Sequence, residues 1–277
     1  MRLAVSSYSF WHFRGEYPVE RVLEDAAALG VAGVEVLERQ LGADVSAVRL
    51  HRLRRRALEL GLDLVGLATH QNFVLPDPAA RREEVRRTVR SLEVAAALGV
   101  PCVRVNSGRW NTLGSFDALM AAGGVEPPAA GYRDEDGFAW CVEALAEVLP
   151  HAERLGVVLA LENHWGLTVR AEGVLRILDA LPSPYLAALL DTGNFPRGVG
   201  VEMYEDMRRL APRAVLVHAK AYHGGGEWYD LDIDYGLVRA ILEAAGYRGY
   251  VSLEFEGRAP AERGVPEALA ALRSAGF

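Results

Sequence analysis

The chain has 277 residues, 51% of them hydrophobic, which is enough to bury a large core in one α/β domain or in two smaller ones. Its formal net charge is −7, whereas a protein that binds nucleic acid through phosphates usually presents a basic face. No apolar run reaches the ~18 residues of a membrane span, the N-terminus turns polar after Val5, and two cysteines are too few for a disulfide framework. We therefore expect a cytoplasmic protein that binds neither membranes nor nucleic acid.

One pattern recurs along the chain: a helical stretch, then a glycine, then a short apolar run rich in Val and Leu. The glycine is expected to adopt the left-handed conformation that ends a helix and turns the chain into a strand. These glycines are Gly30, Gly61, Gly99, Gly156 and Gly246. The runs predict strands at about 3–9, 33–38, 62–69, 102–107, 157–163, 186–192, 214–220 and 250–256, with helices at about 18–29, 46–60, 79–98, 135–155, 171–180, 201–211, 234–245 and 263–274.

Eight alternating strand–helix units predict a single closed (β/α)8 barrel over residues 1–277. An open doubly wound sheet is the alternative, but it would normally carry a Gly-rich phosphate loop after an early strand, and Gly224-Gly225-Gly226 follows a late one. The long irregular stretch at about 108–134 lies on the side where barrel active sites form. We expect it to be a lid, a binding loop or a contact in a homo-oligomer.

Polar residues at the carboxyl ends of the strands decide what such a barrel does, because chemistry collects there. Each of the last four predicted strands delivers one charged or imidazole group, and closure of the barrel would bring the four to one rim. Three carboxylates without a compensating charge would repel one another, so a divalent cation is expected, either Mn²⁺, Mg²⁺ or Co²⁺, with Zn²⁺ as an alternative. A structural ion-pair network is the competing interpretation. The four residues are Glu162, Asp191, His218 and Glu254.

Lys220 is the only lysine among the 30 basic residues, and strand alternation points it the same way as His218. Its compact ammonium could stabilise negative charge on a substrate oxygen, or it could be an unreplaced surface lysine. Other polar and aromatic groups follow strand ends and are candidates for substrate binding, with helix capping, structural hydrogen bonding or ordinary packing as the alternatives. They are Trp11, His70, Asn106, Trp165 and Asn194.

The strand-end motifs Leu-Glu-Asn-His, Asp-Thr-Gly-Asn, His-Ala-Lys and Leu-Glu-Phe-Glu, between Leu161 and Glu256, resemble those of the sugar phosphate isomerase/epimerase superfamily of xylose-isomerase-like barrels. The resemblance covers the whole chain. It implies that Glu162, Asp191, His218 and Glu254 hold the metal, that Glu162 and Glu254 are the acid/base pair, and that His70 contacts substrate or metal. Asn106, Asn194 and the Asp230-Leu231-Asp232 segment stand where the three-metal nucleases of this superfamily have histidines, which argues against a nuclease.

The expected activity is therefore metal-dependent isomerisation or epimerisation of a keto-sugar or keto-polyol through an enediolate, with catalytic roles for Glu162, Glu254 and Lys220. A lyase that dehydrates an inosose shares the first chemical step and is the main alternative. A nuclease and a non-catalytic binding barrel fit the residues less well. We expect a non-phosphorylated substrate, because no Gly-rich phosphate-binding turn follows the last strands.

Overall fold

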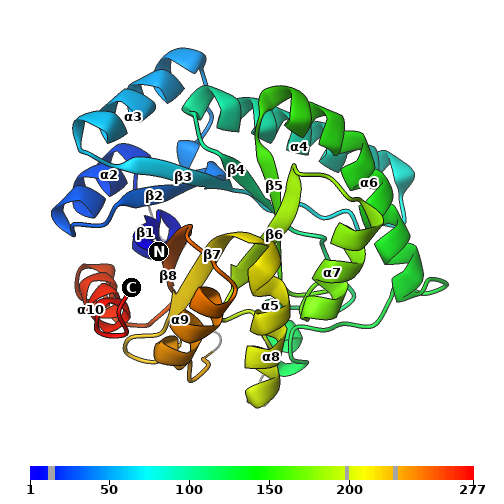
Figure 1. The fold of residues 1–277 in the computed structure, drawn as a ribbon. Coiled ribbons are helices and arrows are strands. Elements are labelled where there is room, and N and C mark those ends of the chain that lie inside the picture. Colours follow the sequence, from blue (N-terminus) through cyan, green and yellow to red (C-terminus); the bar gives the residue numbers. More distant parts are fainter. Residues whose placement is uncertain (12–15, 197–199, 227–229) are drawn as a thin grey trace.

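A computed structural model describes residues 1–11, 16–196, 200–226 and 230–277. Eight parallel strands, each paired with its neighbours in sequence and with β8 paired to β1, close into a barrel (Figure 1). This confirms the predicted (β/α)8 fold. The strands are β1 (Arg2–Ser6), β2 (Gly33–Leu37), β3 (Asp63–Ala68), β4 (Cys102–Val105), β5 (Val158–Glu162), β6 (Leu186–Asp191), β7 (Ala214–Ala221) and β8 (Tyr250–Phe255).

Helices surround the barrel, and the eight that were predicted all form within two residues of their expected bounds. The five glycines of the repeated pattern have φ values between 68° and 80°, which confirms their left-handed conformation at helix ends. The helices are α1 (Tyr8–Trp11), α2 (Val19–Ala28), α3 (Ala47–Glu59), α4 (Pro78–Leu98), α5 (Phe116–Ala121), α6 (Asp134–Leu155), α7 (Ala171–Ala180), α8 (Val201–Leu210), α9 (Tyr235–Ala244) and α10 (Ala261–Ser274), with 3-10 turns η1 (Glu38–Leu41) and η2 (Ala211–Arg213).

The first strand is shorter than predicted, because it ends at Ser6 and the short helix α1 follows. The Ser7 hydroxyl accepts the N–H of Leu37 at 2.8 Å, and the Ser9 hydroxyl bridges Leu253 O and Phe255 N at 3.0 Å each. These side-chain bonds to β2 and β8 fasten the turn of α1 across the barrel mouth instead of extending the strand.

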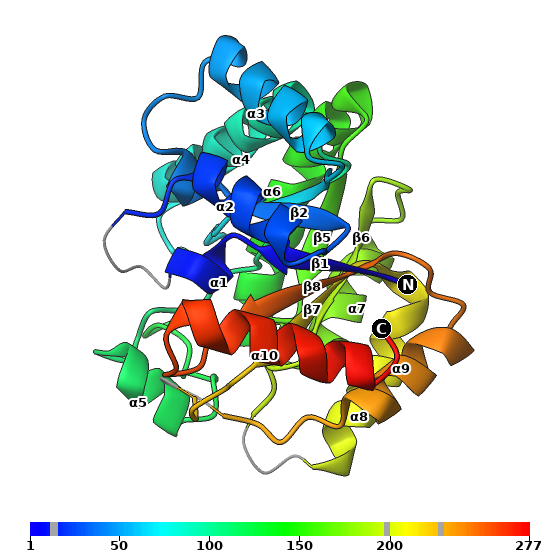
Figure 2. The same cartoon turned by 90° about the vertical axis from the view of Figure 1, so that its left-hand side faces the viewer.

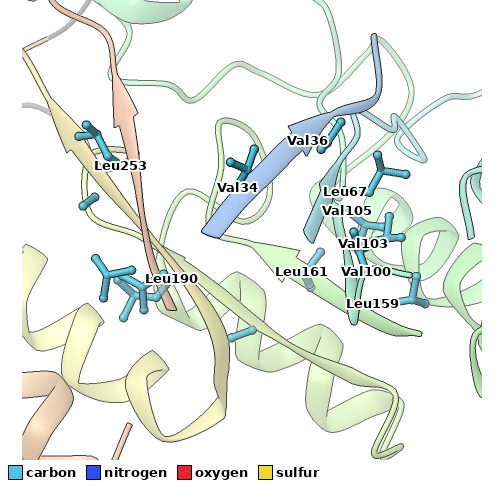
Figure 3. Close-up of a cluster of buried hydrophobic side chains, with 14 of the residues drawn as sticks. Val34, Val36, Leu67, Val100, Val103, Val105, Leu159, Leu161, Leu190 and Leu253 are labelled. Atoms are coloured by element: carbon cyan, nitrogen blue, oxygen red, sulfur yellow. The ribbon is translucent and has the colours of Figure 1, made fainter. Parts of the chain in front are cut away.

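The core has two layers. The larger one fills the space between strands and helices, and Figure 3 shows part of it, including Val34, Val36 and Leu161. A smaller apolar layer lies inside the barrel, as strand alternation requires. It consists of Ala4, Val65, Cys102, Ala160, Leu189 and Leu216.

This inner layer positions the polar residues. Two residues further along their strands, Arg104 follows Cys102, Glu162 follows Ala160, Asp191 follows Leu189 and His218 follows Leu216. A period of two keeps each of these side chains on the inward face, one step closer to the carboxyl end. The barrel interior is therefore apolar towards the amino ends of the strands and charged at their carboxyl ends.

The long stretch after β4 contains the short helix α5. The Glu126 carboxylate, 5% exposed, accepts the backbone N–H groups of Asn111 at 2.6 Å, Thr112 at 3.0 Å and Leu113 at 3.2 Å. These bonds tie the two arms of the loop together. In Figure 2, α1 and α5 lie at the end of the barrel opposite both chain termini.

Candidate metal centre and active site

The four predicted ligand residues meet at the carboxyl end of the barrel. Each offers one ligand atom, and these atoms all lie within 4.8 Å of one another. The three residues on β5, β6 and β7 are fully buried and the one on β8 is 4% exposed. Within the described ranges no other group of three or more His, Cys, Asp or Glu residues could hold a metal ion. We refer to Glu162, Asp191, His218 and Glu254 as the four-ligand cluster.

The charges around the cluster fit a divalent cation. Five carboxylates, those of the cluster, of Glu35 and of Glu256, surround two permanent cations, Arg104 and Lys220. Negative charge therefore exceeds permanent positive charge around the cluster, which favours the binding of a cation. Asp191 Oδ2 is buried without a hydrogen-bond partner among the described residues, and burial raises the pKa of this carboxyl group. A carboxylate oxygen left in this way is suited to bind a metal.

Glu35 on β2 orients the histidine of the cluster and was not predicted. His218 Nε2 lies 2.9 Å from Glu35 Oε1, whereas His218 Nδ1 lies 3.0 Å from Glu162 Oε1 and 3.5 Å from Asp191 Oδ2. A carboxylate on the far ring nitrogen fixes the orientation of a metal-binding imidazole. Nδ1 is therefore the nitrogen that faces the other members of the cluster and could bind a metal ion. The sequence feature that could have indicated this role is a glutamate inside an apolar strand, with a valine on either side.

Arg104 on β4 also escaped prediction and lies between two carboxylates of the cluster. Its guanidinium Nη1 is 3.5 Å from Glu162 Oε2 and 3.8 Å from Glu254 Oε1, and Nη2 donates to Thr69 O at 3.0 Å. The side chain is 4% exposed. An arginine held in this way compensates buried negative charge and keeps its own orientation fixed.

Lys220 points into the same site, as strand alternation predicted. Its Nζ lies 2.8 Å from Glu254 Oε2 and 2.7 Å from Glu256 Oε1. Burial by itself would lower the pKa of Lys220, but Glu254, Glu256 and Asp191 hold that pKa well above its usual value. The ammonium therefore stays charged at neutral pH.

Both acid/base candidates are ionised at neutral pH. Burial would raise the pKa of Glu254, but Lys220, His218 and Arg104 outweigh it and lower the pKa to about 2. Burial would also raise the pKa of Glu162. That pKa nevertheless lies well below its usual value, because Arg104, His164 and His218 favour the ionised carboxylate. Both residues can therefore bind a cation or accept a proton, and neither would donate one without a change in its surroundings.

A cavity of about 400 Å³ opens above the cluster, and we call it the central cavity. Its wall includes three of the predicted substrate-binding residues, His70, Trp165 and Asn194, together with Lys220 and Glu254. This volume lies in the usual range for a small-molecule site. The remaining lining residues are Tyr8, Leu37, Arg104, Phe116, Met120, His164 and Glu256.

Two predicted substrate contacts lie elsewhere. Asn106 donates its side-chain N–H to Glu162 Oε2 at 2.9 Å, so it holds a ligand residue instead of lining the central cavity. Trp11 packs against the apolar group of Tyr8, Leu37 and Ala68 and is not among the described residues of the cavity wall. Trp11 is the last residue of α1, beyond the end of β1, so strand alternation does not set the direction of its ring.

His164 on the segment after β5 lines the central cavity and was not singled out by the sequence. Burial lowers its pKa to about 4, and its Nε2 is 4.0 Å from Glu162 Oε2. The ring is therefore neutral at physiological pH and can accept or donate a hydrogen bond to a substrate hydroxyl. The His immediately after Leu-Glu-Asn was the signal available in the sequence.

Gly124 in the long loop packs directly under Trp165. A Cβ at this position would lie 2.0 Å from Trp165 Cε3, and the φ of +80° disfavours any L side chain. We expect Gly124→Ala to lower the free energy of unfolding by about 1–3 kcal/mol and to change the tryptophan fluorescence by displacing Trp165. Gly114→Ala is the matched control, because nothing lies within 4 Å of its Cβ; an equal effect of both substitutions in urea denaturation would contradict this packing.

The fold and site define a class of protein, a (β/α)8 barrel with a buried carboxylate–imidazole cluster at its carboxyl end. The chain belongs to the xylose isomerase-like TIM barrel family, whose model matches residues 23–275. It is 26% identical over 231 residues to the 3-oxo-isoapionate decarboxylase of Pectobacterium atrosepticum, an alignment that covers 80% of this chain and 69% of the relative. No helix of the described residues is long and apolar enough to cross a membrane.

Solved structures of sugar epimerases have the same fold. The 3-keto-D-glucoside 4-epimerase of E. coli superposes with a TM-score of 0.77 and 17% identity, covering 99% of both chains. The D-psicose 3-epimerase of Clostridium cellulolyticum H10, solved with D-tagatose, gives a TM-score of 0.78 and 17% identity over 99% of both chains. At these identities the structural similarity establishes the shared fold.

Proposed function

We propose that this chain is a divalent-metal-dependent enzyme that isomerises or epimerises a keto-sugar or keto-polyol through an enediolate. The observation that carries the proposal is the four-ligand cluster, whose ligand atoms lie within 4.8 Å of one another and whose Glu254 lines the central cavity. The family membership and the activities named for the related proteins support a sugar-modifying enzyme.

Glu162, Asp191, His218 and Glu254 would hold the metal ion, which when bound supplies Lewis-acid polarisation of a substrate carbonyl. One of Glu162 and Glu254 accepts the proton from the carbon next to that carbonyl, and a carboxyl group returns a proton. Return to the opposite face of the same carbon gives epimerisation, and return to the neighbouring carbon gives isomerisation. Lys220 and Arg104 stabilise the negative charge that develops on the substrate oxygens.

Decarboxylation of a keto sugar acid is a second candidate. It leads to the same type of enediolate, but the bond that breaks joins the carbon to a carboxylate instead of to a hydrogen. Two buried cations, Arg104 and Lys220, line the central cavity and could bind that carboxylate. The name of the 26% identical relative, 3-oxo-isoapionate decarboxylase, supports this candidate.

The reaction type is testable with ketoses, inososes and 3-keto sugar acids in D2O, followed by NMR and mass spectrometry. We expect incorporation of one deuterium from solvent next to the carbonyl of a ketose, without loss of CO2 or water. Release of CO2 from a keto acid would establish decarboxylation instead, and loss of water from an inosose would establish dehydration. Turnover of none of these substrates would contradict the proposal.

Metal binding is testable independently of turnover. We expect elemental analysis to find one equivalent of Mn, Mg or Co, and addition of that metal at a hundredfold excess over its Kd to stabilise the chelated protein by about 2.7 kcal/mol, or roughly 5–10 °C in Tm. Asp191→Ala should abolish the shift because it removes a ligand. An equal Tm increase in that variant would place the metal elsewhere.

A further inference from the structure

A second cavity, of about 280 Å³, lies beside the central cavity. We call it the side cavity. The two cavities share three lining residues, His70, His164 and Trp165, so one ligand can contact both. Amide side chains, among them those of Asn72, Asn106 and Asn111, share the rest of the polar wall with Glu84 and two arginines. The shared ring of Trp165 offers an apolar face on which a sugar ring can stack.

The charges of the side cavity favour a neutral ligand. Two arginines line it, but both already have carboxylate partners: Arg87 Nη2 is 3.2 Å from Glu84 Oε2, and Arg109 Nη1 is 3.4 Å from Glu126 Oε2. A phosphate or carboxylate bound there would have to compete with Glu84 and Glu126 for these guanidinium groups. Hydroxyl groups, in contrast, can bind Asn106 Oδ1 and the exposed amide of Asn111 without displacing any charge.

The side-chain oxygen of Asn106 is a buried acceptor that such a hydroxyl could donate to. Asn106 is 5% exposed, and its Nδ2 donates to Glu162 Oε2 at 2.9 Å. Its Oδ1 is buried and has no hydrogen-bond partner among the described residues. An amide oxygen in this state needs a donor, because an unpaired buried polar atom costs about 1–3 kcal/mol. The bond to Glu162 links the side cavity to the four-ligand cluster.

We propose that the side cavity is a second sugar-binding subsite, which takes a hydroxyl-bearing substituent, a glycosyl or polyol group, attached to the keto-sugar in the central cavity. The substrate is then larger than a free monosaccharide. This inference rests on the proposed function, because it assumes that the keto-sugar itself lies over the four-ligand cluster. Donation of a hydroxyl to Asn106 Oδ1, hydrogen bonds to the exposed amide of Asn111 and stacking on Trp165 supply the recognition.

The test compares free ketoses with keto-disaccharides by isothermal titration calorimetry on the Mn²⁺-supplemented protein. D-fructose and D-tagatose are the free ketoses, and turanose, isomaltulose and lactulose are the disaccharides. We expect at least one disaccharide to bind ten times more tightly than either ketose. Saturation-transfer NMR should show contact of the protein with both of its rings.

Asn111→Gly tests the side cavity without threatening the fold. Asn111 is exposed, lines the cavity and has a φ of +57°, a conformation that glycine adopts at no steric cost. We expect this variant to lose most of the preference for the disaccharide and to keep its affinity for the ketose. Asp117→Asn on α5, outside both cavities, is the control and should retain the preference.

The outcomes separate this inference from the proposed function. Turnover of a ketose by an enzyme that binds no disaccharide more tightly would overturn the subsite and leave the proposed function standing. A disaccharide preference that Asn111→Gly removes, in a protein without turnover, would support the subsite and overturn the proposed reaction. A preference that survives Asn111→Gly would overturn the subsite.

Discussion

Replacing Glu254 by Gln should lower kcat by about 10²–10⁴-fold, the usual contribution of a general acid or base. Glu254 is both a member of the four-ligand cluster and one of the two carboxylates proposed to move the proton, and the amide can do neither well. The substitution preserves size, and Lys220 can still donate to the amide oxygen. The measurement is steady-state kinetics on the identified substrate, together with solvent deuterium exchange and circular dichroism.

The matched control for this prediction is Glu38→Gln. Glu38 is a half-buried glutamate whose pKa is raised by burial, and it does not belong to the described wall of the central cavity. The kcat of the Glu38→Gln enzyme should stay within threefold of the wild-type value. A Glu254→Gln enzyme with wild-type kcat would remove this residue from the mechanism, and equal losses in both variants would point to a general effect of buried charge.

Replacing Arg104 by Met should destabilise the metal-free protein by about 3–5 kcal/mol, the usual effect of removing one partner of a buried ion pair. Methionine fills much of the same volume, so the loss arises from Glu162 and Glu254, which keep their charges without the guanidinium. Urea denaturation in EDTA at neutral pH measures this change. Adding Glu162→Gln to Arg104→Met should recover part of the lost stability, because it removes one uncompensated charge.

The pH dependence of stability gives the same prediction a second readout. The pKa of Glu254 is about 2 in the folded protein, below the 4.5 of an ordinary glutamate. Its ionisation therefore stabilises the fold above pH 4.5, and this contribution disappears as the pH falls towards 2. Without Arg104 the folded-state pKa of Glu254 rises, so the contribution should be smaller and should disappear at higher pH. Unchanged neutral-pH stability and acid unfolding in Arg104→Met would show that the guanidinium does not compensate these carboxylates.

The sequence predicted the polar groups on the last four strands, including His218 and Glu254 inside β7 and β8, but missed two charged residues on earlier strands. Glu162 and Asp191 are the last residues of β5 and β6, where polar groups after an apolar run are easy to recognise. Glu35 and Arg104 stand inside their strands between valines. Their importance depends on partners that are far away in the sequence: Glu35 contacts His218, 183 residues later.

Trp11 and Asn106 both follow apolar runs and were expected to contact substrate, but neither is among the described residues of the central cavity wall. Asn106 bonds to Glu162, on the neighbouring strand, and lines the side cavity, whereas Trp11 belongs to a short helix that the run of Ser and aromatic residues did not reveal. The direction of a side chain beyond the end of a strand is set by the local turn, so strand alternation no longer predicts it.

The sequence by itself determined the repeating strand–helix units, their glycine ends and the identity of the four-ligand cluster, because these depend on local periodicity, on the left-handed conformation of glycine and on one charged group per strand. Only the tertiary structure decided which charges compensate one another and where the two cavities lie. Closure of the barrel sets these distances, and it brings together residues as far apart as Glu35 and His218. Because Coulomb and hydrogen-bond energies depend on such distances, no local pattern could supply them.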